Sequence, residues 1–204
     1  MTKKILAFTL AEVLLTMTII GVLAALTIPT LYYQRVKKEY TTKLKNFYSK
    51  MENAILDMEV DFGSFRDMKQ PDNGYMWYMK YIDPYVGHQF VKENKTVYYY
   101  KDGSSLGTFF KGGCLDVDYD VNADRPPNKQ GYDKHRFLFC FTDDNRRRWF
   151  GNADIFFGTY GSGISGSNIS RNSMINSCKA NTAYCTRLLQ NDQWEFKSDY
   201  PLKF

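Results

Sequence analysis

The chain has 204 residues, of which 17% are aromatic, and a formal net charge of +5. This length accommodates one membrane span and one folded domain that buries its own core without bound metals. With 24% charged and 44% hydrophobic residues, the composition excludes a disordered chain, and so small a net charge gives little support to nucleic-acid binding.

The first predicted element is a membrane span from Phe8 to Ile28, which is apolar apart from one full charge, Glu12. About 20 apolar residues in a helix cross the hydrocarbon core of a bilayer. The run is longer than the apolar part of a cleaved secretory signal, and no small-x-small cleavage site follows it. An ionised side chain inside the span costs about 2.5–3.5 kcal/mol, so Glu12 requires an explanation. Pro29 is expected to interrupt or kink the helix at the end of the span.

A second, amphipathic helix is predicted to run to about Val60 and to stop at Gly63. Its apolar residues recur at spacings of three and four and indicate one face that packs on a sheet: Val36, Tyr40, Leu44, Phe47, Met51 and Ile55. Between them lie basic residues that suit either a solvated face or contact with lipid headgroups or DNA: Arg35, Lys37, Lys38, Lys43, Lys45 and Lys50.

The remaining chain changes from helix to strand signals. "QPDNGYMWYMKYIDPYVG" predicts a turn and a short aromatic helix, and "TVYYYKDGSSLGTFF" predicts a hairpin around its Asp-Gly turn. "CLDVDYDV" and "HRFLFCF" predict two further strands, and "RRRWF" follows the turn "TDDN". The expected fold class is α+β: a long N-terminal helix, transmembrane in one half and amphipathic in the other, packed on a C-terminal antiparallel sheet of about four strands.

The N-terminal residues resemble a known processing signal. Lys3-Lys4, then "AFTLAE", then an apolar run that ends at Pro29 is similar to the start of type IV pilins and type II secretion pseudopilins. The resemblance implies that a prepilin peptidase cuts between Ala7 and Phe8 and that Phe8 is then N-methylated. The family usually has Gly at the position of Ala7.

The same resemblance implies a function in assembly for Glu12 and Pro29. Cleavage leaves a free amino group on Phe8, and the Glu12 carboxylate of one subunit can neutralise the Phe8 amine of its neighbour in a filament. The alternative is a pair within one chain, because Phe8 and Glu12 are separated by one helical turn. Pro29 would mark a bend in the helix.

Three later segments also resemble a branch of pseudopilin-type proteins: "YYYKDGSSL", "DVNADRPPNKQGYDKHRFLF" and "WEFKSDYP". That branch often has Gly where this chain has Ala123, and Gly tolerates the positive φ of a tight turn.

The loop after "CLDVDYDV" is rich in oxygen-bearing side chains. Asp120, Asn122 and Asp124 are candidate calcium ligands, with Asn128 and Asp133 further along the same loop, because Ca²⁺ prefers carboxylate and carbonyl oxygens. The complete EF-hand pattern is absent from the sequence. The alternative is a network of Asx turns, in which short polar side chains bond their own backbone.

Four cysteines allow three pairings, and an exported domain favours disulfides. Cys114 and Cys140 flank the polar loop and would lie opposite each other if their strands form a hairpin, while Cys178 and Cys185 enclose a short loop. We therefore predict Cys114–Cys140 and Cys178–Cys185. A zinc site is the rival, but the spacing lacks Cys-x-x-Cys and the chain has few histidines.

Nothing in the sequence indicates an enzyme. The two histidines, His88 and His135, lie in no nucleophile motif. Asp143-Asp144 suits a turn better than a pair of catalytic carboxylates. The run from Arg146 to Arg148 is expected on a solvated strand edge, where it discourages aggregation, or in contact with DNA or an acidic neighbour.

The domain prediction has four parts: a prepilin leader (1-7), a transmembrane and assembly helix (8-29), an amphipathic helix (30-62) and a pilin-like globular domain (63-204). We expect a structural subunit of a type II secretion pseudopilus or type IV pilus-like filament, which needs no cofactor of its own. Its expected partners are other pilin or pseudopilin subunits, prepilin peptidase, the inner-membrane assembly platform and membrane lipid. Lys3 and Lys4 favour a cytoplasmic N-terminus at the bacterial inner membrane, which places the globular domain in the periplasm or in an extracytoplasmic filament. The alternative is a monomeric membrane-anchored adhesin or receptor.

Overall fold

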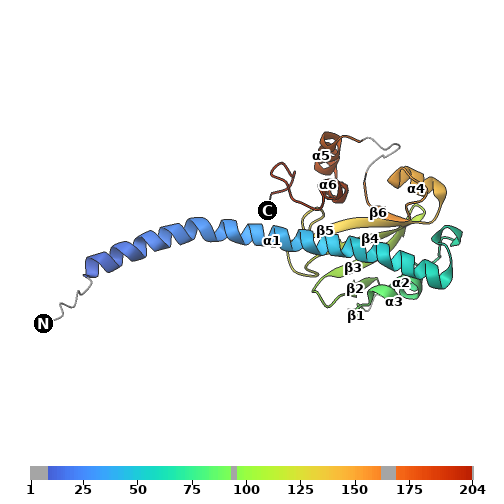
Figure 1. Cartoon of the computed structure of the whole chain (residues 1–204), viewed down its shortest axis with the longest axis horizontal. Coiled ribbons are helices and arrows are strands. Elements are labelled where there is room, and N and C mark those ends of the chain that lie inside the picture. Colours follow the sequence, from blue (N-terminus) through green and yellow to red (C-terminus); the bar gives the residue numbers. More distant parts are fainter. Residues whose placement is uncertain (1–8, 93–95, 162–168, 204) are drawn as a thin grey trace. The chain divides into compact units, whose positions relative to one another are not determined.

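The computed structural model describes residues 9–92, 96–161 and 169–203. The chain divides into two compact units, one that extends to Glu39 and one that begins at Tyr40, hereafter the head. Helix α1 (Leu10–Phe62) contributes to both units (Figure 1). Pro29 lies inside α1, so the prediction that it interrupts the helix is wrong. Proline removes one backbone donor, and the hydrogen bonds of the neighbouring turns are sufficient to continue the helix.

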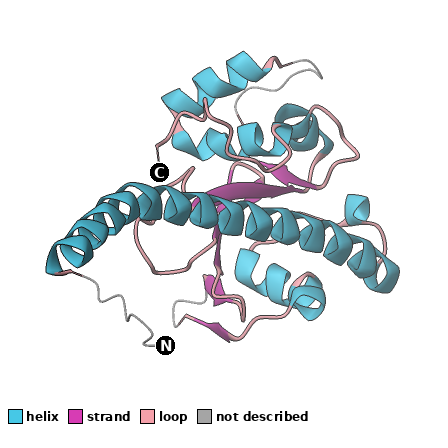
Figure 2. Cartoon of the chain, turned by 60° about the vertical axis from the view of Figure 1, so that its left-hand side comes forward, coloured by secondary structure: helices cyan, strands magenta, loops and turns pink. Residues whose placement is uncertain are grey.

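The head segment of α1 lies across one face of the sheet (Figures 1 and 2). Two residues outside the predicted stripe, Ala54 and Met58, are also buried. The other buried side chains are predicted members of the stripe: Leu44, Phe47, Met51 and Ile55. The helix ends where it was predicted to end: Gly63 has φ 86°, and its N–H donates to the Glu59 carbonyl oxygen at 3.0 Å.

Short helices follow α1. A single 3₁₀ turn, η1 (Phe65–Asp67), precedes α2 (Gly74–Tyr81) and α3 (Asp83–Val86). The predicted aromatic helix is thus present in two pieces, and Gly87 ends the second.

The sheet contains six strands in the described part of the chain: β1 (Phe90–Val91), β2 (Val97–Tyr99), β3 (Ser105–Lys111), β4 (Cys114–Asp120), β5 (Lys134–Cys140) and β6 (Phe157–Thr159). Each strand pairs antiparallel with the next, in the order β1-β2-β3-β4-β5-β6. The predicted α+β class is confirmed, and the short edge strands β1 and β6 account for the larger number of strands.

The segment predicted as a turn followed by a strand is a helix, α4 (Asp143–Phe150). The Thr142 hydroxyl caps its first turn by accepting from the Asn145 N–H, and Gly151 ends it in the left-handed conformation. The first turn is acidic and the last turn basic, which matches the helix dipole. These capping signals outweigh the strand propensity of Trp149 and Phe150.

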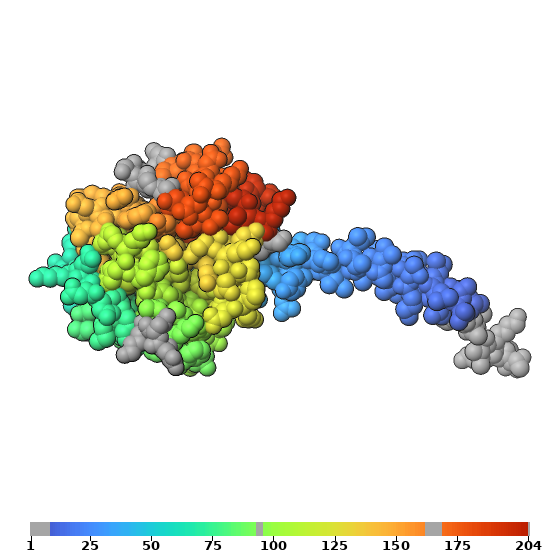
Figure 3. Space-filling view, turned by 180° about the vertical axis from the view of Figure 1, so that it is seen from behind, coloured from blue at the N-terminus to red at the C-terminus, as the bar shows by residue number. Residues whose placement is uncertain are grey.

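The C-terminal part of the head is helical, with α5 (Arg171–Ala180), the 3₁₀ turn η2 (Thr182–Tyr184) and α6 (Cys185–Asn191). In Figure 3 these elements, in orange to red, adjoin the strands, in green to yellow, on the surface of the head. The main core fills the space between α1 and one face of the sheet, and a smaller apolar cluster lies on the other face beneath α4.

Candidate functional site

Glu12 has hydrogen-bond partners at the start of α1. Its Oε2 accepts from the backbone N–H and from the hydroxyl of Thr9, both at 2.9 Å. The Glu12 N–H donates to the Thr9 hydroxyl at 3.2 Å. This reciprocal arrangement is a capping box, which satisfies donors that the first turn of a helix leaves free. This capping box is absent from the predictions above, although Thr-x-x-Glu before an apolar run is its signature.

The apolar part of α1 has the properties of a membrane span. An 18-residue window has a mean hydropathy of 2.1, and none of it is buried against the described residues. Thr16, Thr18 and Thr27 donate their hydroxyls to carbonyl oxygens three or four residues earlier, so these polar groups are satisfied within the helix. The segment is long and apolar enough to cross a membrane. The proposed cleavage residues, Ala7 and Phe8, lie outside the described residues.

The three calcium candidates point at protein partners. Asp120 Oδ1 accepts from the Asn122 N–H at 3.1 Å, which forms an Asx turn. The Asn122 side-chain amide donates to the Tyr40 hydroxyl at 3.0 Å, and Asp124 Oδ2 accepts from the Tyr99 hydroxyl at 2.7 Å. Burial raises the pKa of Asp120 to about 6.

Asp133, at the end of the same loop, is fully buried and accepts from the backbone N–H groups of Asn128 and Lys129 at 2.8 and 2.7 Å. Of the predicted network of Asx turns, one turn is present, at Asp120 and Asn122, whereas Asp133 accepts from backbone groups that precede it in the loop. Over the described ranges, no group of three or more His, Cys, Asp or Glu side chains is placed to hold a metal ion. Ala123 has φ 55°, so the tight turn forms although the position carries a Cβ.

Both predicted disulfides are present. Cys114 and Cys140 are direct partners in the β4–β5 ladder, with a Cα–Cα distance of 4.3 Å. The second disulfide joins Cys178 of α5 to Cys185 of α6, and these two cysteines are seven residues apart in the sequence. All four cysteines of the chain are thereby oxidised.

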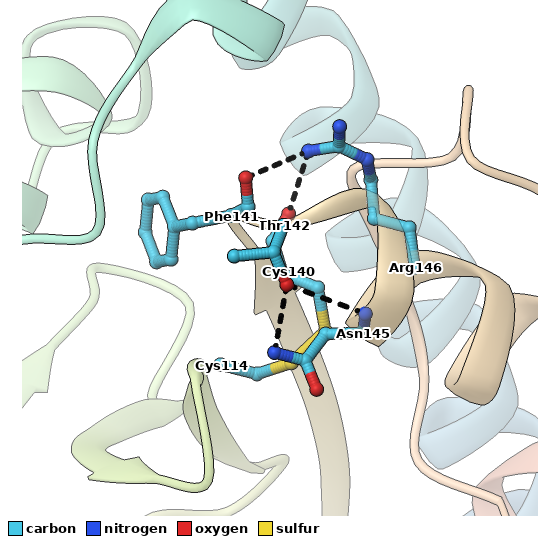
Figure 4. Close-up of a disulfide and its surroundings, with 6 residues drawn as sticks. All are labelled: Cys114, Cys140, Phe141, Thr142, Asn145 and Arg146. Carbon is cyan, nitrogen blue, oxygen red and sulfur yellow. Dashed lines mark hydrogen bonds between the residues drawn. A yellow bond between two sulfur atoms is a disulfide. The ribbon is translucent and has the colours of Figure 1, made fainter.

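Arg146 supports the chain beside the first disulfide (Figure 4). Its guanidinium donates to the carbonyl oxygens of Cys140 at 3.3 Å and of Phe141 at 3.0 Å, and it also bonds Asp143. Only 1% of Arg146 is exposed, so the prediction of a solvated edge is wrong for this residue. The helical period turns Arg146 inward, whereas the Arg147 side chain is 62% exposed and pairs with Asp143.

Two lysines of the predicted basic face attach α1 to the rest of the head. Lys43 Nζ donates to the carbonyl oxygens of Asp102 and Val121, both at 2.9 Å, and Lys50 Nζ donates to that of Val86 at 2.6 Å. Part of the basic face therefore has a structural function rather than a solvated one.

A cavity of about 360 Å³ lies beside α1, with Phe47, Tyr100 and Tyr119 among its walls and Lys50 and His88 also lining it. His88 Nδ1 lies 2.8 Å from an Asp83 carboxylate oxygen. The other histidine, His135, is fully buried, which lowers its pKa to about 4, and its Nε2 lies 3.1 Å from the Tyr132 carbonyl oxygen.

These features define an α+β protein with one N-terminal helix able to cross a membrane and a head that contains two disulfides. Residues 30–204 match a family of unknown function, DUF6613, and the chain belongs to this family. Comparisons with curated proteins and with solved structures found no match. The family match begins just after Pro29, so it covers the head and leaves the apolar segment outside.

Proposed function

We propose that this protein is a pilin-like structural subunit. Prepilin peptidase removes residues 1–7, and the mature chain polymerises through its N-terminal helix into a type II secretion pseudopilus or a type IV pilus-like filament. Catalysis is not part of this function.

The observation that carries the proposal is the combination of an uncovered apolar helix with a single carboxylate in its first turn. Large side chains stay exposed along the whole segment, from Leu10 at 80% to Leu26 at 69% and Leu31 at 63%. Such a surface is stabilised by lipid or by another protein segment, such as a further copy of the same helix.

Glu12 favours further copies over lipid alone. The capping box gives its carboxylate two donors, yet an ionised side chain at this position in the span is costly. In the processed chain the nearest new cation is the free amine of Phe8. Pairing the carboxylate of one subunit with the amine of a neighbour offsets part of the cost of both charges and specifies the register between subunits.

The head supports an extracytoplasmic location. Disulfides persist in oxidising compartments, and both disulfides of this chain lie in the head. The proposed topology therefore has the N-terminus in the cytoplasm, one span in the bacterial inner membrane and the head in the periplasm or filament. The partners would be other pilin-type subunits, the peptidase, the assembly platform and lipid.

The direct test is the intact mass of the protein from hosts with and without a prepilin peptidase. The expected result is loss of Met1–Ala7 only where the peptidase is present, with or without one added methyl group on Phe8. An intact Met1 in both hosts would overturn the proposal.

The capping box also favours a second candidate, a monomeric membrane-anchored adhesin or receptor, because it gives Glu12 a use within one chain. Two substitutions separate the candidates. Glu12→Gln keeps an acceptor for Thr9 and preserves the cap, whereas Glu12→Ala removes both the cap and the charge.

For a filament subunit, both variants insert and are cleaved, but neither enters filaments that can be sheared from the cell. For a monomeric anchor, no sheared filament forms even from the unsubstituted chain. Normal incorporation of Glu12→Gln into filaments would show that the charge of Glu12 is dispensable.

A further inference from the structure

The cavity beside α1 has an apolar floor and a polar rim. Phe47, Val86 and Tyr119 are buried and form its floor, together with the half-buried ring of Tyr100. The exposed residues that line it form its rim: Asn46, Lys50, Gly87, Lys101 and Asp102. All of these residues belong to the head. Its volume of about 360 Å³ has room for about twelve groups the size of a water molecule, which is the size of a small organic ligand.

The aromatic side chains of the floor present ring surface rather than free hydroxyls. The Tyr100 hydroxyl lies 2.7 Å from that of Tyr78, and the Tyr119 hydroxyl bonds the Ser104 side chain. Phe47 stacks on Tyr119 with ring centroids 4.0 Å apart. Because both hydroxyls have protein partners, this floor favours an apolar body, and aromatic rings gain further energy when they pair with other rings.

The rim has an excess of positive charge. Lys50 and Lys101 supply two ammonium groups, and Asp102 supplies one carboxylate. Asp102 Oδ1 already accepts from the Ser104 backbone N–H at 3.0 Å and from its hydroxyl at 2.5 Å. Lys50 Nζ donates to the Val86 carbonyl oxygen at 2.6 Å, and an ammonium has two further donors to offer. The rim therefore favours an anion over a cation.

His88 contributes a polar wall with little effect on this charge balance. Its Nδ1 lies 2.8 Å from an Asp83 carboxylate oxygen, so any positive charge on the imidazole faces a negative one. The same contact orients the ring, which makes this wall of the cavity rigid.

We propose that this cavity binds a small planar aromatic anion, such as a benzoate-type carboxylate. The ring of the ligand packs against Phe47, Tyr100 and Tyr119, and its carboxylate faces Lys50 and Lys101. This binding site lies within the head and does not rest on the proposed filament function.

The test is isothermal titration calorimetry of the full-length chain in lipid nanodiscs with para-hydroxybenzoate, and empty nanodiscs correct for partition of the probe into lipid. The expected result is saturable binding at one site per chain. The matched neutral probe, para-hydroxybenzamide, has nearly the same shape without the charge and should bind about tenfold more weakly.

Two substitutions at exposed positions locate the site. Asn46→Phe places a ring at the rim and should abolish binding of para-hydroxybenzoate, whereas Asn53→Phe, about two turns further along α1 and outside the lining, should leave it unchanged.

Lys101→Glu should weaken binding of para-hydroxybenzoate about tenfold, and Lys69→Glu, an exposed lysine outside the lining, is its control. Because all four substituted side chains are exposed, each variant should keep the thermal unfolding midpoint of the unsubstituted chain, which is measured in the same nanodiscs.

Three outcomes would overturn the inference. Absence of saturable binding of para-hydroxybenzoate up to millimolar concentrations would show that the cavity does not take this class of ligand. Equal affinity for the carboxylate and the amide would show that the rim does not select an anion. Binding that survives both Asn46→Phe and Lys101→Glu would place the ligand elsewhere on the protein.

Discussion

The two faces of the β4–β5 hairpin differ in what covers them. On the inner face, Leu115 pairs with Phe139 and Val117 with Phe137, and all four side chains belong to the core beneath α1. On the outer face the pairs are a disulfide (Cys114–Cys140), Asp116 opposite Leu138, and two ion pairs, Asp118–Arg136 and Asp120–Lys134. Both faces are largely buried, one by apolar packing and the other by specific pairs.

Asp116 is the exception on the outer face, because its cross-strand partner is apolar. It is 2% exposed, its Oδ1 accepts no hydrogen bond from the described residues, and the Arg136 Nε lies 4.0 Å away. An outward position on a strand is therefore not necessarily a solvated one. A carboxylate there destabilises the fold unless it finds a donor.

The largest expected effect on stability comes from truncating a phenylalanine that packs on the inner face. A phenylalanine on the outer face provides the comparison. Phe47 of α1 stacks on Tyr119, with ring centroids 4.0 Å apart, and is 6% exposed, whereas Phe109 is 38% exposed and contacts Arg136. Phe47→Ala should lower the free energy of unfolding by about 3–5 kcal/mol, because it opens a cavity in the core. Denaturant unfolding in detergent, followed by tryptophan fluorescence, measures this in the head, where all three tryptophans lie.

Phe109→Ala makes the same chemical change and serves as the control. Its expected cost is about 1 kcal/mol, from partial burial and the lost cation–π contact. Equal losses of unfolding free energy in the two variants would show that the outer face is packed as the inner face is, which would contradict the difference between the two faces.

The sequence predicted the inner face because alternation indicates which residues share a side of a strand. "CLDVDYDV" alternates and places Leu115 and Val117 on one side, whereas "HRFLFCF" is a continuous apolar run that predicts burial without showing that Phe137 and Phe139 face α1. Alternation contains no information about what covers the other side. That cover includes α4, and the sequence signals of this helix are its capping residues, Thr142 and Gly151, and not the arginine run between them.

The second effect concerns Asp116 and depends on pH. Burial raises its pKa to about 7, with the Arg136 charge acting in the opposite direction. Near pH 4 the folded chain keeps this carboxyl protonated and the unfolded chain has lost only about half of its proton, so the group has little effect on stability. As the pH rises towards 7, the unfolded chain loses this proton while the folded chain keeps it, so stability falls. Asp116→Asn should therefore stabilise the head at pH 8, on the order of 2 kcal/mol, and have little effect at pH 4.

Asp118→Asn is the matched control on the same face. Asp118 accepts from Arg136 Nε at 2.7 Å and from its Nη2 at 2.9 Å. Removing this partner should destabilise the head by about 1 kcal/mol near neutral pH, the opposite sign to Asp116→Asn. Thermal unfolding of both variants at pH 4 and pH 8 measures the difference. A destabilising Asp116→Asn at pH 8 would mean that Asp116 is stabilised as an anion.

The candidate site was predictable to a different extent from the fold. The apolar run and its carboxylate could be identified from composition, and the cysteine pairs from their position on the expected hairpin. The local partner of Glu12 could also have been found, since Thr9 is three residues before it. The buried position of Arg146 and the partners of Asp120, Asn122 and Asp124 could not, because they depend on which element lies above each side chain.

The smallest expected effect on stability concerns the turn that follows β4. Ala123 adopts φ 55°, a left-handed conformation that costs an L-residue about 1–2 kcal/mol, partly offset by the higher entropy of unfolded glycine. Ala123→Gly should raise the free energy of unfolding by about 0.5–1 kcal/mol. Ala180→Gly, at the exposed end of α5, should lower it by a similar amount, because glycine disfavours a helix. Denaturant titration of the two variants tests this opposition of signs. Destabilisation by both would show that the Ala123 methyl group makes contacts that outweigh its backbone strain, and that this turn is stabilised by packing as the inner face is.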